Sequence, residues 1–341
     1  MSTAPIVATG ADRNDALPST KVTAETIAAL RESLCSESTP LPIRFRALFS
    51  LKHVAKHDHD EQNYLAALEA IGAAFVSPSA LLKHELAYCL GQSGKTEATP
   101  PLRKVLSDLQ EDPMCRHEAA EALGALGFPE NLDILREFLN SEGEDVSVKD
   151  TCEIAIDRIK WENSEQRKQE KLRQRSCALY ARICANRRRA GEVAHGHQGT
   201  PFHEVPRHVR FARPRFTPDL PTAEPAVLAL AKGFSDPSAL FRHEIAFVFG
   251  QLSHPASIPA LTAALSDTAE ASMVRHEAAE ALGSLGEEDG VEDILKGFLN
   301  DKEKVVRESV IVALDMVDYE QSNQTEYALI PDSAPKTTVA A

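Results

Sequence analysis

The sequence predicts an all-α fold, a solenoid of stacked helix pairs arranged in two facing halves. Three observations predict it. Short words recur at fixed spacings, apolar residues recur every three or four positions within each unit, and no segment alternates apolar and polar residues with the period of a strand. Helix pairs of this size cannot bury their apolar faces alone, so neighbouring pairs must stack and share one core.

The repeats occur at two levels. The words KHELAYCLGQSG (83–94) and RHEAAEALGALG (116–127) start 33 residues apart, from 83 to 116. The words RHEIAFVFGQLS (242–253) and RHEAAEALGSLG (275–286) have the same spacing, from 242 to 275. The second pair of words follows the first by 159 residues, from 83 to 242. The chain therefore consists of two similar halves, each built from several helix pairs.

The elements follow in order, with Gly or Asp-Pro marking the turns between helices. The expected units lie near 23–56, 64–94, 98–127 and 129–161, and then near 225–252, 256–286 and 291–319, with a further unit expected before residue 225. The last unit reads as the helices VEDILKGFLND and VVRESVIVALDMV. The expected domains are a disordered N-terminus (1–21), an N-terminal half (22–161), a linker or irregular segment (162–224), a C-terminal half (225–321) and a disordered tail (322–341).

Composition limits the class of protein. The chain has 341 residues, 43% of them apolar, which is enough for a sizeable core. Its 37 Lys and Arg against 51 Asp and Glu give a net charge of −14, which disfavours a nucleic-acid partner. No apolar run is long enough to span a membrane, and no signal peptide is evident, so we expect a cytoplasmic protein. The six cysteines form no CxxC pair and are expected to be packing residues.

Four His-Glu pairs carry the chemistry, each preceded by Lys or Arg at the same point of its unit's second helix. They are His84-Glu85, His117-Glu118, His243-Glu244 and His276-Glu277. The terminal units lack the pair, because Lys149-Asp150 and Glu308-Ser309 stand in its place. The fold itself therefore does not require it. A single such pair is more simply explained by helix capping and the helix dipole, but four pairs at matched spacings are not.

Equivalent positions of successive repeats stack on one surface, so each half is expected to present two imidazoles and two carboxylates side by side. Imidazole and carboxylate ligands without thiolate favour iron or manganese over a structural zinc site. Two histidines and one carboxylate are the ligands of non-haem iron sites for oxygen chemistry. The eight residues can supply two such triads and leave two carboxylates over.

At these residues the chain resembles deoxyhypusine hydroxylase. The resemblance rests on the His-Glu quartet, on ALLKHELAYCLGQ and ALFRHEIAFVFGQ, and on PMCRHEAAEALGALG and SMVRHEAAEALGSLG, and it covers about 42–161 and 225–319. It implies a HEAT-repeat dimetal monooxygenase with two Fe²⁺ per chain. The implied reaction uses O2 and an external reductant to convert the deoxyhypusine of a translation initiation factor to hypusine. We further expect a monomer with no membrane or nucleic-acid partner.

The resemblance also implies a role for each residue. His84, His117 and Glu118 would bind one iron, and His243, His276 and Glu277 the other. Glu85 and Glu244 would be catalytic and substrate-binding residues that face the amine of the substrate. This division is physically reasonable, because a buried ammonium group without a carboxylate partner would be costly.

Other candidates are weaker. His53, His57 and His59 lie in KHVAKHDHDEQ, which we interpret as a solvated polar insertion between helices. Phe247 and Phe249 are expected to pack in the core, although one of them could line the cavity. The competing functional class is a non-catalytic helical-repeat scaffold, or a repeat protein of the bilin-lyase kind. Stoichiometric bound iron distinguishes the enzyme from both.

The stretch from about 175 to 220 has no helical periodicity, and its histidines and arginines are crowded. We expect it to be an out-of-frame translation, so that His195, His197, His203 and His208 are not ligands. Reading PFHEVPRHVRFAR (from Pro201) one nucleotide later permits LF(M/T)(K/R)YRAMFALR, which parallels LPIRFRALFSLK (41–52) position by position. The alternative is a disordered linker, which the composition also allows.

Overall fold

The computed structural model describes residues 22–165, 167 and 223–321, and every regular element among them is a helix. The all-α prediction is confirmed. These residues fall into two compact units that meet in sequence at Ile159 and Lys160, and each unit is described here by itself. The predictions for 1–21, for most of 162–224, including its four histidines, and for 322–341 lie outside the described residues.

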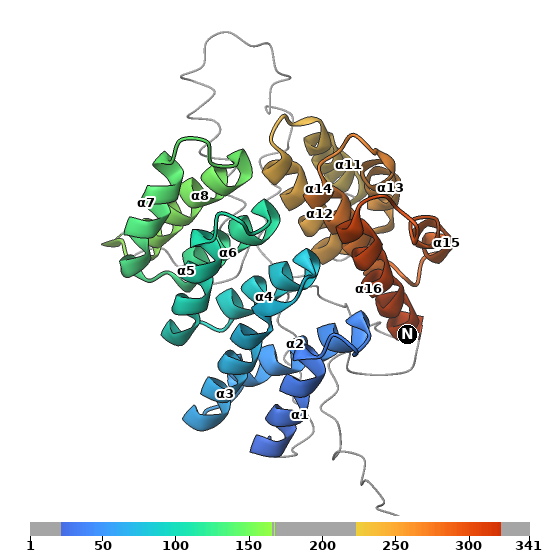
Figure 1. The fold of residues 1–341 in the computed structure, drawn as a ribbon. Coiled ribbons are helices and arrows are strands. Elements are labelled where there is room, and N and C mark those ends of the chain that lie inside the picture. The colour runs from blue at the N-terminus through green and yellow to red at the C-terminus, as the bar shows by residue number, and fades with distance from the viewer. Residues whose placement is uncertain (1–21, 166, 168–222, 322–341) are drawn as a thin grey trace, which may run out of the picture. The chain divides into compact units, whose positions relative to one another are not determined.

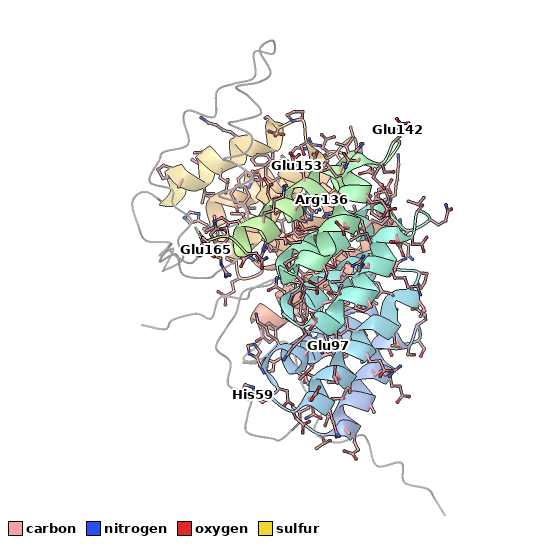
Figure 2. The ribbon with its side chains drawn as sticks, turned by 90° about the vertical axis from the view of Figure 1, so that its left-hand side faces the viewer. His59, Glu97, Arg136, Glu142, Glu153 and Glu165 are labelled. Atoms are coloured by element: carbon pink, nitrogen blue, oxygen red, sulfur yellow. The ribbon has the colours of Figure 1, made fainter. Side chains whose placement is uncertain are left out.

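The first half contains four helix pairs, drawn from blue to green in Figure 1. They are α1 (Ala24–Cys35) with α2 (Leu41–His57), α3 (Glu61–Ala73) with α4 (Ala80–Gln92), α5 (Thr99–Ser107) with α6 (Pro113–Leu126), and α7 (Leu132–Asn140) with α8 (Val146–Glu162). Leucines and alanines of these helices form its core, and exposed charges such as His59, Glu97 and Arg136 lie on its surface (Figure 2).

The described part of the second half contains three pairs, drawn from yellow to red in Figure 1. They are α11 (Ala223–Ala231) with α12 (Ala239–Leu252), α13 (Ile258–Ser266) with α14 (Ser272–Gly283), and α15 (Val291–Lys296) with α16 (Lys304–Gln321). No helix in the described ranges is both long and apolar enough to cross a membrane.

Local signals in the sequence set where the site-bearing helices begin and end. Helix α4 begins after Ser79, whose side chain accepts a hydrogen bond from the backbone N–H of Leu82, and Ser238 does the same for Phe241 at the start of α12. Helix α6 has Asp112 as its N-cap and Pro113 in its first turn, and it ends at Gly127, whose φ is 75°.

The second helices of successive pairs pack very closely. A Cβ built on Gly91 of α4 would lie 2.8 Å from the Cα of Ala122 in α6, and one on Gly283 of α14 would lie 2.9 Å from the Cα of Ala313 in α16. Only glycine allows the backbones to approach to this distance. This packing brings the His-Glu pairs of neighbouring helices within reach of each other inside each half.

Two expected helix limits were wrong. Helix α2 continues through His53 to His57, so that only His59 of the three lies in the polar connection, while the rings of His53 and His57 lie 4.7 Å apart. Helix α15 ends at Lys296 although the pattern VEDILKGFLND predicted a longer helix. In the corresponding helix α7 a glutamate, Glu137, stands where the second half has Gly297, and glycine is a poor residue for a helix interior.

Candidate metal centre

The four His-Glu pairs occupy equivalent places on four helices, α4 and α6 in the first half and α12 and α14 in the second. All eight side chains are buried, and His117 and His276 have no exposed surface at all. A buried imidazole or carboxylate is costly unless it has a partner. The contacts of these side chains within each half therefore indicate which kind of ligand they can bind.

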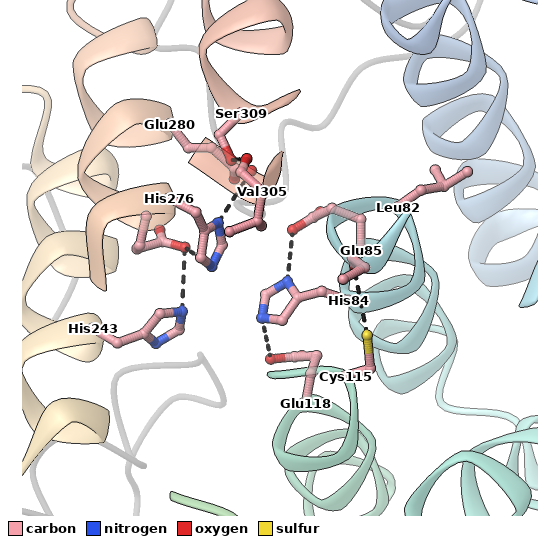
Figure 3. A network of polar contacts seen from close by, with 12 residues as sticks. Leu82, His84, Glu85, Cys115, Glu118, His243, His276, Glu280, Val305 and Ser309 are labelled. Atoms are coloured by element: carbon pink, nitrogen blue, oxygen red, sulfur yellow. Dashed lines mark hydrogen bonds and ion pairs between the residues drawn. The ribbon is translucent and has the colours of Figure 1, made fainter. Parts of the chain in front are cut away.

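In the first half, His84 of α4 faces Glu118 of α6. The Nε2 atom of His84 lies 3.3 Å from Oε2 of Glu118 (Figure 3). The ring centroids of His84 and His117 are 5.5 Å apart, and the two rings offer nitrogen atoms within 4.8 Å of each other. The three residues that the resemblance implies as one ligand set thus lie together.

The second half repeats this arrangement. The Nε2 atom of His243 lies 3.5 Å from Oε2 of Glu277, and the Nε2 atom of His276 lies 3.9 Å from the same oxygen. The ligand atoms of all three residues lie within 4.8 Å of one another. The structure brings together His243, His276 and Glu277, the triad expected from the sequence.

These distances fit a metal ion. Two bonds of about 2.1 Å to one ion place the ligand atoms roughly 3.0–4.2 Å apart, depending on the angle between the bonds. The contacts of 3.3, 3.5 and 3.9 Å fall in that range. Nitrogen and carboxylate donors without sulfur suit iron or manganese. The His243, His276 and Glu277 set of the second half can therefore hold one ion, and in the first half His84 lies close to both His117 and Glu118.

Glu85 and Glu244 approach the opposite edge of the first histidine in each half. Oε1 of Glu85 lies 3.3 Å from Nδ1 of His84, and Oε1 of Glu244 lies 3.3 Å from Nδ1 of His243. The other carboxylate oxygen of Glu244, Oε2, is buried and has no hydrogen-bond partner among the described residues. That oxygen can accept a hydrogen bond from a cationic group that enters the site.

The carboxylates also determine the protonation of these two rings. Burial alone would lower the pKa of His84, but Glu118 and Glu85 outweigh it and raise the pKa well above its usual value. Burial likewise opposes the charge on His243, whereas Glu244 and Glu277 raise its pKa to about 10. A metal ion binds the neutral imidazole, so it would replace a proton as the partner of the same carboxylates.

Two further glutamates belong to this environment, and the sequence reasoning missed both. Oε1 of Glu280 lies 3.6 Å from Nδ1 of His276, one helical turn earlier. In the first half, ligand atoms of His117, Glu118 and Glu121 lie within 4.8 Å of one another. The signal was available, because the word HEAAE occurs at both 117–121 and 276–280.

The basic residue before each histidine ties neighbouring repeats together. Arg116 donates to the backbone carbonyl of Leu106 and to both carboxylate oxygens of Glu144, and Arg275 makes the same set of contacts with Leu265 and Asp301. The matching pairs on the first motif of each half are Lys83 with Glu111 and Arg242 with Glu270. These ion pairs fix the position of each histidine-bearing helix against the connection between the two helices of the next pair.

The remaining candidates have structural roles. Phe249 is fully buried against Phe234, while Phe247 is partly exposed. Of the described cysteines, Cys89, Cys115 and Cys152 are buried and Cys35 is partly buried, and none forms a disulfide. Burial raises the pKa of Cys152 to about 12, which keeps its thiol protonated and unreactive.

Comparison with known proteins identifies the repeat and the family. A family model for HEAT repeats matches residues 68–153 and 226–315. A deoxyhypusine hydroxylase of Neurospora crassa is 66% identical over 322 residues, which cover 92% of this chain and 99% of the relative. Its counterpart in Gibberella zeae is 64% identical over 318 residues, which cover 91% of this chain and 94% of the relative.

A solved structure of human deoxyhypusine hydroxylase, in complex with glycerol, superposes with a TM-score of 0.67 at 37% identity and covers 86% of this chain and 96% of that one. High identity thus extends over nearly the full length of the relatives, and the helix pairs that carry the four His-Glu motifs are of the same repeat fold. The chain belongs to the deoxyhypusine hydroxylase family of HEAT-repeat enzymes.

Proposed function

We propose that this monooxygenase holds two Fe²⁺ ions, one in each half, and hydroxylates the deoxyhypusine side chain of a translation initiation factor. His84, His117 and Glu118 bind one ion, and His243, His276 and Glu277 bind the other. The observation that carries the proposal is the convergence of the second-half triad, whose ligand atoms lie within 4.8 Å of one another in a buried environment.

The bound iron would supply the activation of O2 that no amino-acid side chain can provide. The protein's own residues do the rest. The residues of both proposed triads are buried, so the surrounding helices limit the access of water to them. The carboxylates that raise the pKa of His84 and His243 would balance the charge of an ion instead.

Glu85 and Glu244 bind the substrate amine and are the catalytic groups that orient its side chain. The support is electrostatic, because Glu244 has a buried carboxylate oxygen without a hydrogen-bond partner in the described ranges. An ammonium group is a suitable partner for such an oxygen. The net charge of −14 also favours approach of a cationic side chain on a basic partner surface.

The other parts of the proposal concern the setting of the reaction. An external reductant would supply the electrons that the reaction with O2 requires. The enzyme acts as a monomer in the cytoplasm, where the free thiols of its buried cysteines stay reduced.

The test is metal analysis together with product formation. Protein purified without oxygen is expected to contain about two iron atoms per chain and to convert a deoxyhypusine-containing protein to its hydroxylated form once O2 and a reductant are added. Protein reconstituted with Mn²⁺ alone distinguishes the two metals that the donor set allows. A full-length chain that binds neither metal in stoichiometric amount would be a repeat scaffold, and the proposal would be wrong.

A further inference from the structure

Each half carries, on its second histidine helix, a glutamate one turn after the histidine that lies outside the proposed set of three ligands. Glu280 is buried, with 6% of its surface exposed, and its Oε1 lies 3.6 Å from Nδ1 of His276 (Figure 3). Glu121 has the same position in the sequence relative to His117, but it is only partly buried. A carboxylate kept at the depth of Glu280 is costly, so it needs a specific partner.

The other helices of this set differ at the equivalent position. In α4 and α12 it holds Tyr88 and Phe247, and in these helices the Nδ1 atoms of His84 and His243 face Glu85 and Glu244 instead. In the terminal helix α8 the position holds Glu153, which is exposed and follows Lys149 rather than a histidine. Among the glutamates at this position, Glu280 and Glu121 follow a histidine and are buried or partly buried, whereas Glu153 follows a lysine and is exposed.

We propose that Glu280 is a positioning residue that accepts a hydrogen bond from Nδ1–H of His276 when Nε2 of that ring binds the ion. This inference rests on the proposed metal function. With the proton held on Nδ1, the lone pair of Nε2 is directed to the ion, and the ring cannot rotate away from it. The Nε2 atom of His276 already faces Glu277, at 3.9 Å. Carboxylates that hold the second nitrogen of a ligand histidine raise its basicity and fix its tautomer.

The geometry separates this role from that of a ligand. Within the second half, Glu277 approaches both His243 and His276 through one oxygen, whereas Glu280 approaches the opposite nitrogen of His276. The imidazole of His276 therefore lies between the carboxylates of Glu277 and Glu280. Only the carboxylate on its Nε2 side, that of Glu277, also approaches the second histidine, His243. Loss of a positioning carboxylate weakens metal binding, typically by 10- to 100-fold, but does not abolish it.

The test uses Zn²⁺ as a diamagnetic probe on the full-length chain. Affinity is measured by competition with a chelator, and long-range proton–nitrogen spectra report the Nδ1–H proton of His276. For Glu280→Gln we expect Zn²⁺ affinity in the second half to fall about tenfold or more. The Nδ1–H resonance should also move upfield, because an amide oxygen accepts a weaker hydrogen bond than a carboxylate. The matched control Glu153→Gln should change neither reading.

Three outcomes would overturn the proposal. Unchanged affinity and an unchanged resonance would show that Glu280 does not hold His276. Complete loss of Zn²⁺ in Glu280→Gln, equal to that in Glu277→Gln, would make Glu280 a ligand. An Nδ1 without a proton in the wild-type Zn²⁺ protein would exclude the hydrogen bond even if a variant fails to fold. Failure of the proposed function looks different, because the wild-type chain itself would then bind no stoichiometric metal.

Discussion

Two carboxylates approach each of His84 and His243, one on either side of the ring. Glu118 and Glu277 face Nε2, the nitrogen that converges with the second histidine, whereas Glu85 and Glu244 face Nδ1. The two nitrogens of an imidazole have different roles at a metal site. One binds the ion, and the other forms a hydrogen bond that fixes the orientation of the ring. The glutamates on the two sides should therefore respond differently to mutation.

We expect Glu118→Ala or Glu277→Ala to lose iron, because each removes the only carboxylate of its triad. Glu85→Ala or Glu244→Ala should keep iron within a few-fold of the wild type but bind substrate poorly, because the triads stay intact. Metal analysis beside a substrate-binding assay decides between these outcomes. Equal iron loss in all four variants would show that the ligands are assigned wrongly.

A second prediction concerns Asp301, whose hydrogen bonds from Arg275 hold its pKa below the usual value. Because the folded pKa lies below the unfolded one, this contribution to stability is present above about pH 4 and is lost as the pH falls through the folded pKa. Asp301→Asn should lower the free energy of unfolding at pH 7 by about 1–3 kcal/mol.

The variant should also lose less stability than the wild type between pH 5 and pH 3. Urea unfolding at several pH values measures both effects. Identical pH profiles of the two proteins would mean that the ion pair between Arg275 and Asp301 contributes nothing to the free energy of unfolding.

At the scale of residues, the sequence indicates the candidate metal ligands more directly than the glutamates beside them. Residue type and spacing give the eight candidate ligands, since His and Glu at equivalent repeat positions stack, and the family resemblance implies which of them form the two triads. Residue type and spacing do not give Glu121 and Glu280, because a glutamate one turn after another residue can face solvent just as well, as Glu153 does. Whether such a side chain turns inward depends on the packing of neighbouring helices, which a single sequence does not specify.

At the scale of elements, the close contact of α4 with α6 holds His84 and His117 together. Gly91→Ala would place a methyl group 2.8 Å from the Cα and Cβ of Ala122, and backbone cannot yield as a side chain does. We expect this variant to lose about 1–3 kcal/mol of stability and to bind the first-half metal more weakly.

The matched control is Gly72→Ala in α3, where the new methyl group would meet only Pro101, at 3.8 Å. This change should be neutral or stabilising, because alanine favours a helix more than glycine does. Thermal unfolding and metal affinity are measured for both variants. A Gly91→Ala protein that matches the Gly72→Ala protein in both would show that the helices can separate without cost.

The sequence locates helices better than it locates their ends. The apolar period predicted the helix pairs, because each helix must bury one face. It did not predict that α2 runs on to His57 or that α15 stops at Lys296, because charged residues are tolerated in an exposed last turn and a single glycine outweighs an otherwise regular pattern.

At the scale of the whole molecule, the 159-residue repeat gives each element of the second half a counterpart in the first. Helices α3 and α4 correspond to α11 and α12, and in the first half α1 and α2 pack against this pair. Ala70 and Ile71 of α3 are consequently fully buried. Their counterparts Ala229 and Leu230 are partly exposed, and Leu228 beside them is 52% exposed.

The reading-frame prediction concerns the segment that precedes α11. The counterpart of α1 and α2 would fall within 162–222. The shifted reading of the stretch that begins at Pro201 permits a sequence that resembles that of α2. A chain with that reading should bury the α11 face, so we expect its second half to be more stable than that of the printed chain. An increase of several degrees in its melting temperature would accord with burial of two or three more apolar side chains.

Sequencing the transcript across codons 170–225 tests the prediction at its source, and hydrogen exchange tests its structural consequence. In the corrected chain the amides of α11 should exchange as slowly as those of α3, whereas in the printed chain they should exchange faster, because local opening is easier where fewer apolar contacts are buried. Helix α13, whose neighbours are alike in both chains, is the internal reference. A transcript that supports the printed frame throughout, in a protein with full activity and with α11 as protected as α3, would show that this half is complete as printed.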